Sequence, residues 1–203
     1  KFGISFTLTH LNQAGALVHV DQDGSIHMNH GGTEMGQGLF TKMLAVCADA
    51  LGVPVDRVRQ MRTSTEKVPN TSPTAASSGS DLNGAAVAAA CATLRGRMAP
   101  VAADLLGWEG DPGALVFADN SVQSPAGASV PFPAVAKQCW LQRVSLSSTG
   151  FYATPGIAYD TEAGRGTPFF YYAYGVALVE VELCGLTGEQ RVRRVDILHD
   201  VGN

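Results

Sequence analysis

Two stretches of the sequence combine small residues with polar side chains in a way that could hold a ligand. The first covers residues 31–38, Gly-Gly-Thr-Glu-Met-Gly-Gln-Gly, with four glycines in eight residues. Glycines permit positive φ and let a backbone approach a ligand closely, and the N–H groups at a helix start favour an anion. Gln37 can both donate and accept, which suits a heterocycle or an oxo group. A phosphate-bearing cofactor would fit, although the spacing matches neither common phosphate motif and a structural turn stays open.

The second stretch covers residues 70–80, Asn-Thr-Ser-Pro-Thr-Ala-Ala-Ser-Ser-Gly-Ser, and it also leads into a predicted helix. Successive small residues can form a nest of backbone N–H groups that holds an anion. A flexible surface linker is the alternative. Because two such loops each precede a helix, one shared phosphate-containing ligand is more plausible than a ligand at either loop alone.

Other catalytic signatures are missing from the sequence. It has no Gly-x-Ser-x-Gly motif, and no Cys–His or carboxylate pair is suggested by spacing. Glu34 could act as a base, but compensation of the dipole of the following helix is the favoured interpretation. The aromatic run 169–174 is more typical of strand packing than of a stacking platform.

The cysteines and histidines do not predict a metal site. Cys47, Cys91, Cys139 and Cys184 lie far apart in apolar contexts, which favours buried reduced thiols over zinc or iron–sulfur ligands, with a disulfide as the minor alternative. His27 and His30 are three apart in a predicted strand, so their side chains should point to opposite faces.

The composition excludes several classes of function. A net charge of −4, with only 16% charged and 45% hydrophobic residues, indicates a globular protein without a footprint for nucleic acid or anionic membrane. The longest strictly apolar run, 85–92, is too short for a membrane span. We expect a cytoplasmic protein that continues naturally at both ends of this chain.

The elements that would position the two loops follow from periodicity and turn signals. We expect an α+β fold, with mixed β-sheets packed against two main helices, as one domain or as two lobes, 1–108 and 109–203. The expected strands are 15–20, 25–29, 58–62, 142–148, 169–183 and 190–199, with turns at Asp23-Gly24 and Asp119-Asn120. The expected helices are 39–51, a second capped by Ser80 or Asp81 and kinked or ended by Pro100, and a short one at 131–141.

Several segments together resemble the molybdenum-binding part of the xanthine dehydrogenases, in the xanthine oxidase family. The similarity covers nearly the whole chain and is weakest over 100–138. It rests on residues 1–7 and 11–16, on the loops 31–39 and 68–77, and on 143–147, 149–152 and 174–177.

The resemblance implies a fragment of a molybdopterin cofactor-binding domain, in which the dithiolene sulfurs hold molybdenum and the protein supplies no metal ligand. Cofactor-binding residues would then be Gly36, Gln37 and Gly38 in the first loop, with Gln37 beside the molybdenum oxo and sulfido groups. In the second loop, backbone N–H groups of Ala75, Ala76, Ser77, Ser78 and Gly79 would cradle the pterin and its phosphate. Phe6 would stack on a purine substrate, Thr7 would hydrogen-bond its edge, and Leu11 would line the access channel.

The reaction implied is hydroxylation of hypoxanthine and xanthine with water as the oxygen donor. Electrons would leave through 2Fe-2S clusters and FAD, on other domains or subunits of an oligomeric enzyme, to NAD or oxygen. The family's catalytic glutamate, in a Gly-Glu-Pro-Pro motif, is not among these residues, so we expect no catalytic residue here and an inactive excised chain. An aldehyde oxidase-like hydroxylase and a non-catalytic binding module remain alternatives.

Overall fold

The computed structural model describes residues 2–3, 6–68 and 71–200, which form two compact units. The larger unit is His10–Thr154, and the smaller unit joins Lys1–Thr9 to Pro155–Asn203. This division differs from the boundary after residue 108 that the sequence suggested. The reason is that the segment 112–153 packs against the long central helix of the larger unit.

A mixed four-stranded sheet in the order β4-β3-β2-β8 forms the base of the larger unit. The predicted hairpin is confirmed: β2 (Gln13–Val20) and β3 (Ile26–His30) are antiparallel, and Gly24 in their turn has φ 80°. β4 (Val58–Gln60) runs parallel to β3, and β8 (Ser147–Ala153) runs antiparallel to β2.

The strand expected at 142–148 was placed too early. The preceding helix, α3 (Phe132–Leu141), uses residues 142–144 for its C-terminal cap. Arg143 has φ 61° there, and the Val144 N–H donates to the Cys139 carbonyl at 2.9 Å. Pairing with β2 therefore begins only at Ser147.

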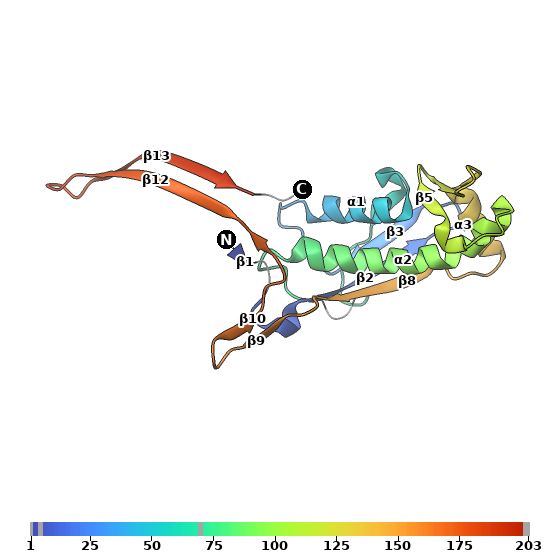
Figure 1. The fold of residues 1–203 in the computed structure, drawn as a ribbon, viewed down its shortest axis with the longest axis horizontal. Coiled ribbons are helices and arrows are strands. Elements are labelled where there is room, and N and C mark those ends of the chain that lie inside the picture. The colour runs from blue at the N-terminus through green and yellow to red at the C-terminus, as the bar shows by residue number, and fades with distance from the viewer. Residues whose placement is uncertain (1, 4–5, 69–70, 201–203) are drawn as a thin grey trace. The chain divides into compact units, whose positions relative to one another are not determined.

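Two main helices cover one face of this sheet (Figure 1), as the sequence predicted. α1 (Leu39–Leu51) has the expected bounds and ends at Gly52, whose φ is 67°. α2 (Gly79–Leu106) begins after Ser78 and not at Ser80 or Asp81. It also continues six residues past Pro100, so the helix does not end there as one of the two expectations had it. The residue four before Pro100 is Gly96, which has open space beside it, and both lie on the exposed side of the helix.

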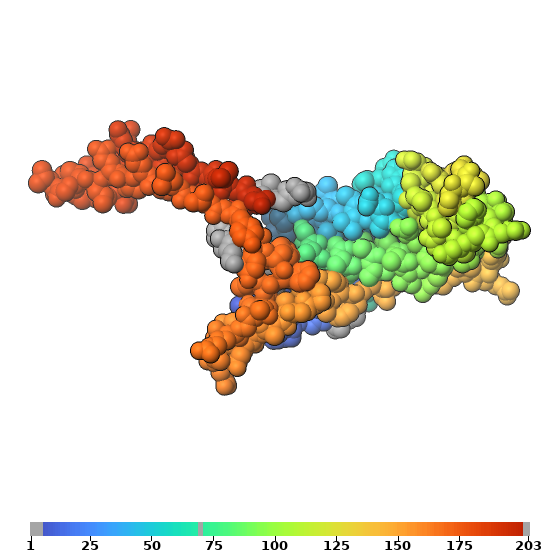
Figure 2. Space-filling model, viewed as in Figure 1, coloured from blue at the N-terminus to red at the C-terminus, as the bar shows by residue number. Residues whose placement is uncertain are grey.

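The core lies between α2, α1 and the sheet. A methyl group added to Gly150 of β8 would lie 2.0 Å from the Ala86 carbonyl oxygen of α2, so helix and strand touch backbone to backbone. This confirms the close approach that the alanine-rich helix suggested. In Figure 2, α1 and α2 lie side by side with the short strands 116–131 against one end of them.

The remaining elements of the larger unit are short. β5 (Val116–Ala118), β6 (Ser121–Gln123) and β7 (Ser129–Pro131) form an antiparallel sheet. The predicted turn is confirmed, because Asp119 and Asn120 have φ of 52° and 58°, as a type I′ hairpin requires. The 3₁₀ helices are η1 (Thr9–Leu11), η2 (Val55–Arg57) and η3 (Pro112–Ala114).

The smaller unit consists of three two-stranded pairs. β1 (Phe2–Gly3) pairs with β11 (Tyr172–Ala173), and β9 (Ala158–Asp160) pairs with β10 (Arg165–Thr167). β12 (Gly175–Leu183) and β13 (Gln190–His199) form the long hairpin that the sequence predicted at the end of the chain.

The four cysteines are free thiols, and three of them are buried as expected. The Cys47 and Cys91 thiols form a hydrogen bond with their sulfurs 3.8 Å apart, without a disulfide. Cys184 is the exception, because it occupies the exposed turn between β12 and β13. Within the described residues, no helix combines the length and apolarity needed to cross a membrane.

Candidate functional site

The two small-residue loops meet in the structure. The Thr33 N–H of the first loop donates to the Thr74 Oγ1 of the second at 2.8 Å. Gly31 makes the approach possible, because a methyl group there would lie 2.1 Å from the Thr71 Oγ1. The sequence predicted both loops but not the hydroxyl groups that join them.

Glu34 closes the start of α1. Its Oε1 accepts from the Gly36 and Gly38 N–H groups at 2.8 and 3.0 Å, and its Oε2 accepts from the Phe40 N–H at 2.9 Å. These bonds, the one from Phe40 above all, lower the pKa of the Glu34 carboxyl. The interpretation of Glu34 as a helix-start anion is confirmed. The N–H groups of Gly36 and Gly38 are thereby already bound, so a ligand could approach these glycines only through the open space beside them.

Gln37 is exposed at the end of the first loop, with its amide folded over the backbone. Its Oε1 accepts from the Met35 N–H at 2.6 Å, and its Nε2 donates to the Thr33 carbonyl at 2.9 Å. Each of the two atoms retains one further hydrogen-bonding position. The amide is therefore fixed in place and can still bind a ligand.

The second loop contains a turn in an uncommon conformation. Ala76 and Ser77 have φ of 54° and 56°, and the Ser78 N–H closes the turn onto the Ala75 carbonyl at 3.2 Å. The left-handed region destabilises a non-glycine residue by about 1–2 kcal/mol, and such strain is concentrated at functional sites. The buried Ser78 hydroxyl also donates to Ala75, at 3.1 Å, so Ser78 serves the turn with both of its donors.

We call the start of α1 closed, because the Glu34 carboxylate binds its N–H groups, and the start of α2 open, because its N-cap side chain makes no capping hydrogen bond. Ser78 precedes the helix without a capping hydrogen bond from its side chain to the helix. Within the described part of the chain, no acceptor pairs with the N–H groups of Ala76, Ser77, Gly79 or Ser80. These donors and the positive end of the helix dipole form an anion cradle.

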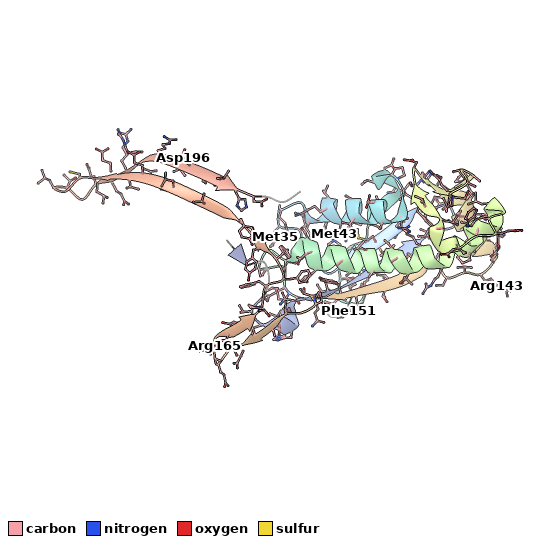
Figure 3. The ribbon with its side chains drawn as sticks, viewed as in Figure 1. Met35, Met43, Arg143, Phe151, Arg165 and Asp196 are labelled. Atoms are coloured by element: carbon pink, nitrogen blue, oxygen red, sulfur yellow. The ribbon has the colours of Figure 1, made fainter. Side chains whose placement is uncertain are left out.

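Both loops line one hollow of about 330 Å³. Met35, labelled in Figure 3, borders it where α1 begins. Four of the predicted cofactor residues line the hollow, whereas Gly36, Gly38, Ala76 and Ser78 do not. The full lining is Met35, Gln37, Leu39, Lys42, Thr74, Ala75, Ser77, Gly79 and Ser80.

Lys42 is a residue of the hollow that sequence reasoning missed. It lies in the first turn of α1, exposed at the edge of the hollow, and it is the cation among the lining residues. Its signal in the sequence was a lysine four residues after the glycine that ends the first loop. An ammonium group beside open helix amides adds to the affinity for an anion.

His30 and Asn83 are buried beside the two loops, and each forms a hydrogen bond with the backbone of one of them. The buried His30 Nδ1 accepts from the Gly32 N–H at 3.1 Å, and the buried Asn83 Nδ2 donates to the Gly79 carbonyl at 2.8 Å. Burial lowers the pKa of His30 to about 4, so the ring is neutral and remains an acceptor at physiological pH. His30 therefore helps to position the first loop. Across the described residues there is no cluster of three metal-ligating side chains.

The predicted substrate residues are divided between the two units. Leu11 lies beside the second loop, because the Ser72 hydroxyl donates to its carbonyl. Phe6, which is half-buried, and Thr7, which is exposed, belong to the smaller unit. The roles of all three toward a substrate stay predictions.

Comparison with known proteins matches the whole chain. A family model described as a molybdopterin cofactor-binding domain covers residues 1–203. Xanthine dehydrogenase of Dictyostelium discoideum is 48% identical over 206 residues, and xanthine dehydrogenase/oxidase of Rattus norvegicus is 47% identical over 203. Each match covers 100% of this chain and 14% of the relative, so the chain spans a small part of these proteins.

Solved structures share the fold, which confirms the fold expected from the sequence. Quinoline 2-oxidoreductase from Pseudomonas putida 86 superposes with a TM-score of 0.76 and 24% identity, over 94% of this chain and 23% of its own. CO dehydrogenase from Oligotropha carboxidovorans gives 0.74 and 21%, over 93% and 22%.

Proposed function

The chain belongs to the molybdopterin cofactor-binding domain family, and we propose that it holds the molybdopterin of a molybdenum hydroxylase. The observation that carries the proposal is a hollow lined by both loops, with the open start of α2 on one side and Lys42 on the other. The residues present fit the cofactor, because an anionic group needs donors and a cation, and no protein ligand to the metal is required.

Each group has a distinct task in this proposal. The N–H groups of residues 76, 77, 79 and 80 would hold the cofactor's phosphate, and Lys42 would balance its charge. The free positions of the Gln37 amide would orient the part of the cofactor nearest the metal. When bound, the molybdenum group supplies the oxidation and the transfer of oxygen from water.

The substrate and electron path are further parts of the proposal. The relatives named above are called xanthine dehydrogenases, which supports a purine, hypoxanthine or xanthine, as substrate. Phe6 would stack on the purine, Thr7 would bind its edge and Leu11 would line its access. The catalytic glutamate, the 2Fe-2S clusters and FAD would lie in other parts of a cytoplasmic, oligomeric holoenzyme, with NAD or oxygen as acceptor. The excised chain alone should be inactive.

The test uses the intact protein, co-expressed with its partner subunits. Molybdenum content and xanthine-dependent dye reduction are measured for the wild type, for Gln37→Ala and for a control, Gln22→Ala. Gln22 is an exposed glutamine in the β2–β3 turn. We expect Gln37→Ala to lose purine oxidation while folding normally, and Gln22→Ala to match the wild type.

Other outcomes assign the function differently. Unchanged turnover in Gln37→Ala would remove Gln37 from the site. Molybdenum with oxidation of aldehydes, but not of xanthine, would replace the purine by an aldehyde. A wild type without molybdenum or activity would mean a non-catalytic binding module.

A further inference from the structure

The β12–β13 hairpin (Figure 1) has one face that is apolar between its two end pairs, Gly175 with His199 and Leu183 with Gln190. Side chains alternate along each strand, and the register pairs Val179 with Val195 and Val181 with Val192. All the residues of this face are exposed; Val181 is 48% exposed and Ile197 is 70% exposed. We call this the apolar face, and its members are Ala177, Val179, Val181, Leu183, Val192, Val195 and Ile197.

The opposite face carries ion pairs in the outer part of the hairpin, toward its turn. Arg193 Nη1 lies 3.3 Å from Glu182 Oε2, and Arg194 Nε lies 2.7 Å from Asp196 Oδ2. The side chain of Asp196 is labelled in Figure 3. Only the end of this face near Gly175 is apolar. The outer part of this face carries paired charges and the middle of the apolar face carries none, which indicates that the charged part is the one suited to solvent.

The apolar face of this hairpin is expected to pack against other apolar side chains. A two-stranded ribbon is marginally stable in water unless one face packs against another layer. A contiguous exposed apolar patch of this kind marks an interaction surface. Valine and isoleucine make up five of its seven residues, and such a β-branched surface suits a second layer of apolar side chains.

We propose that the apolar face packs against an apolar surface of the same polypeptide outside residues 1–203. The length of the relatives carries this choice of occupant: they match this chain from end to end, yet it makes up only 14% of them. The composition agrees, since 16% charged residues is well below the roughly 25% of an average soluble domain. A surface so poor in charge is expected for a piece enclosed within a larger protein.

The experiment places a photo-crosslinking amino acid in the intact protein at position 181, or at position 191 as the control. Arg191 pairs with Glu182, the residue next to Val181 in β12, and lies on the charged face. Crosslinked peptides are identified by mass spectrometry in a mixture of ¹⁴N- and ¹⁵N-labelled protein. We expect position 181 to crosslink to peptides outside residues 1–203 of the same molecule, and position 191 to give few crosslinks.

Three results would overturn the proposal. Crosslinks from 181 into residues 10–154 would mean that the chain covers its own hairpin. Mixed-isotope crosslinks would mean a second copy, and no crosslink at all would mean a solvent-exposed face.

A smaller substitution guards against disruption by the bulky probe. With Cys184 replaced by serine in both variants, alkylation of Val181→Cys should be at least about tenfold slower than that of Arg191→Cys, because a covered thiol reacts only after local opening. Equal rates would contradict a covered face. Neither measurement depends on enzymatic activity. The inference can therefore fail while the proposed function holds, and the reverse is also possible.

Discussion

The starts of α1 and α2 look alike in sequence and differ in structure. Each helix follows a loop of small residues, and the sequence predicted an anion at both. At α1 the anion is internal, because the Glu34 carboxylate takes three backbone N–H groups. At α2 the corresponding donors stay open beside Lys42. A glycine-rich loop before a helix therefore indicates an anion, and the nearby carboxylates decide whether that anion is a ligand.

The largest effect should come from distorting the open start. Ala76→Val places a β-branched side chain at φ 54°, which strains the turn whose N–H groups form the cradle. We expect intact protein that folds with most of its molybdenum missing, measured as metal per polypeptide. The control Ala92→Val lies on the exposed side of α2. Full metal occupancy in Ala76→Val would refute the cradle.

Removing the cation beside the open start should have a smaller effect. Lys42→Gln should raise the rate of cofactor loss on dialysis by about two- to fivefold, the range of an exposed charge pair. The difference from wild type should shrink as salt is added. Lys137→Gln removes an exposed lysine of α3 and is the matched control. Equal losses in both variants would exclude a role for Lys42.

Opening the closed start should affect the first loop locally. In Glu34→Gln the carboxylate charge is lost, so the amides of residues 36–40 should exchange hydrogen faster at neutral pH. The sign with pH follows from the lowered pKa: the carboxylate stabilises the loop above its ordinary value of 4.5, and this is lost as pH falls through the lower folded value. Wild type and variant should therefore converge in acid. A constant difference would contradict this account.

The smallest effect concerns the backbone of the two loops. Ser77→Gly relieves a left-handed serine and should stabilise the protein by about 1 kcal/mol, whereas Gly38→Ala, at φ 75°, should destabilise it by a similar amount. Thermal unfolding of the intact protein measures both. Changes in melting temperature of the same sign in both variants would contradict the view that backbone strain at positive φ sets the effect of each substitution.

Much of the fold could be predicted because its signals are local. The bounds of α1, the Asp23-Gly24 turn and the Asp119-Asn120 turn depend on residues within a few positions of each other. The length of α2 could not be predicted in this way, because tolerance of Pro100 depends on the glycine one turn earlier and on the exposed side they share.

The candidate site was predicted as two loops but not as a set of atoms. The resemblance pointed to Gln37 and residues 75–79, and four of these line the hollow. The hydrogen bonds that Glu34 accepts and the position of Lys42 depend on how the chain turns between residues 34 and 42, which the sequence pattern does not give. The exposure of Cys184 was missed because its apolar neighbours predict burial, whereas it occupies the exposed turn between β12 and β13.

The contact between Gly150 and Ala86 has a mechanical consequence for the cradle. α2 has 28 residues and is therefore about 42 Å long, and its backbone rests on β8 with no room for a methyl group between them. Any movement of α2 toward β8 at this point would bring the two backbones into collision. The glycine in β8 therefore restrains the position of the helix whose first amides form the cradle.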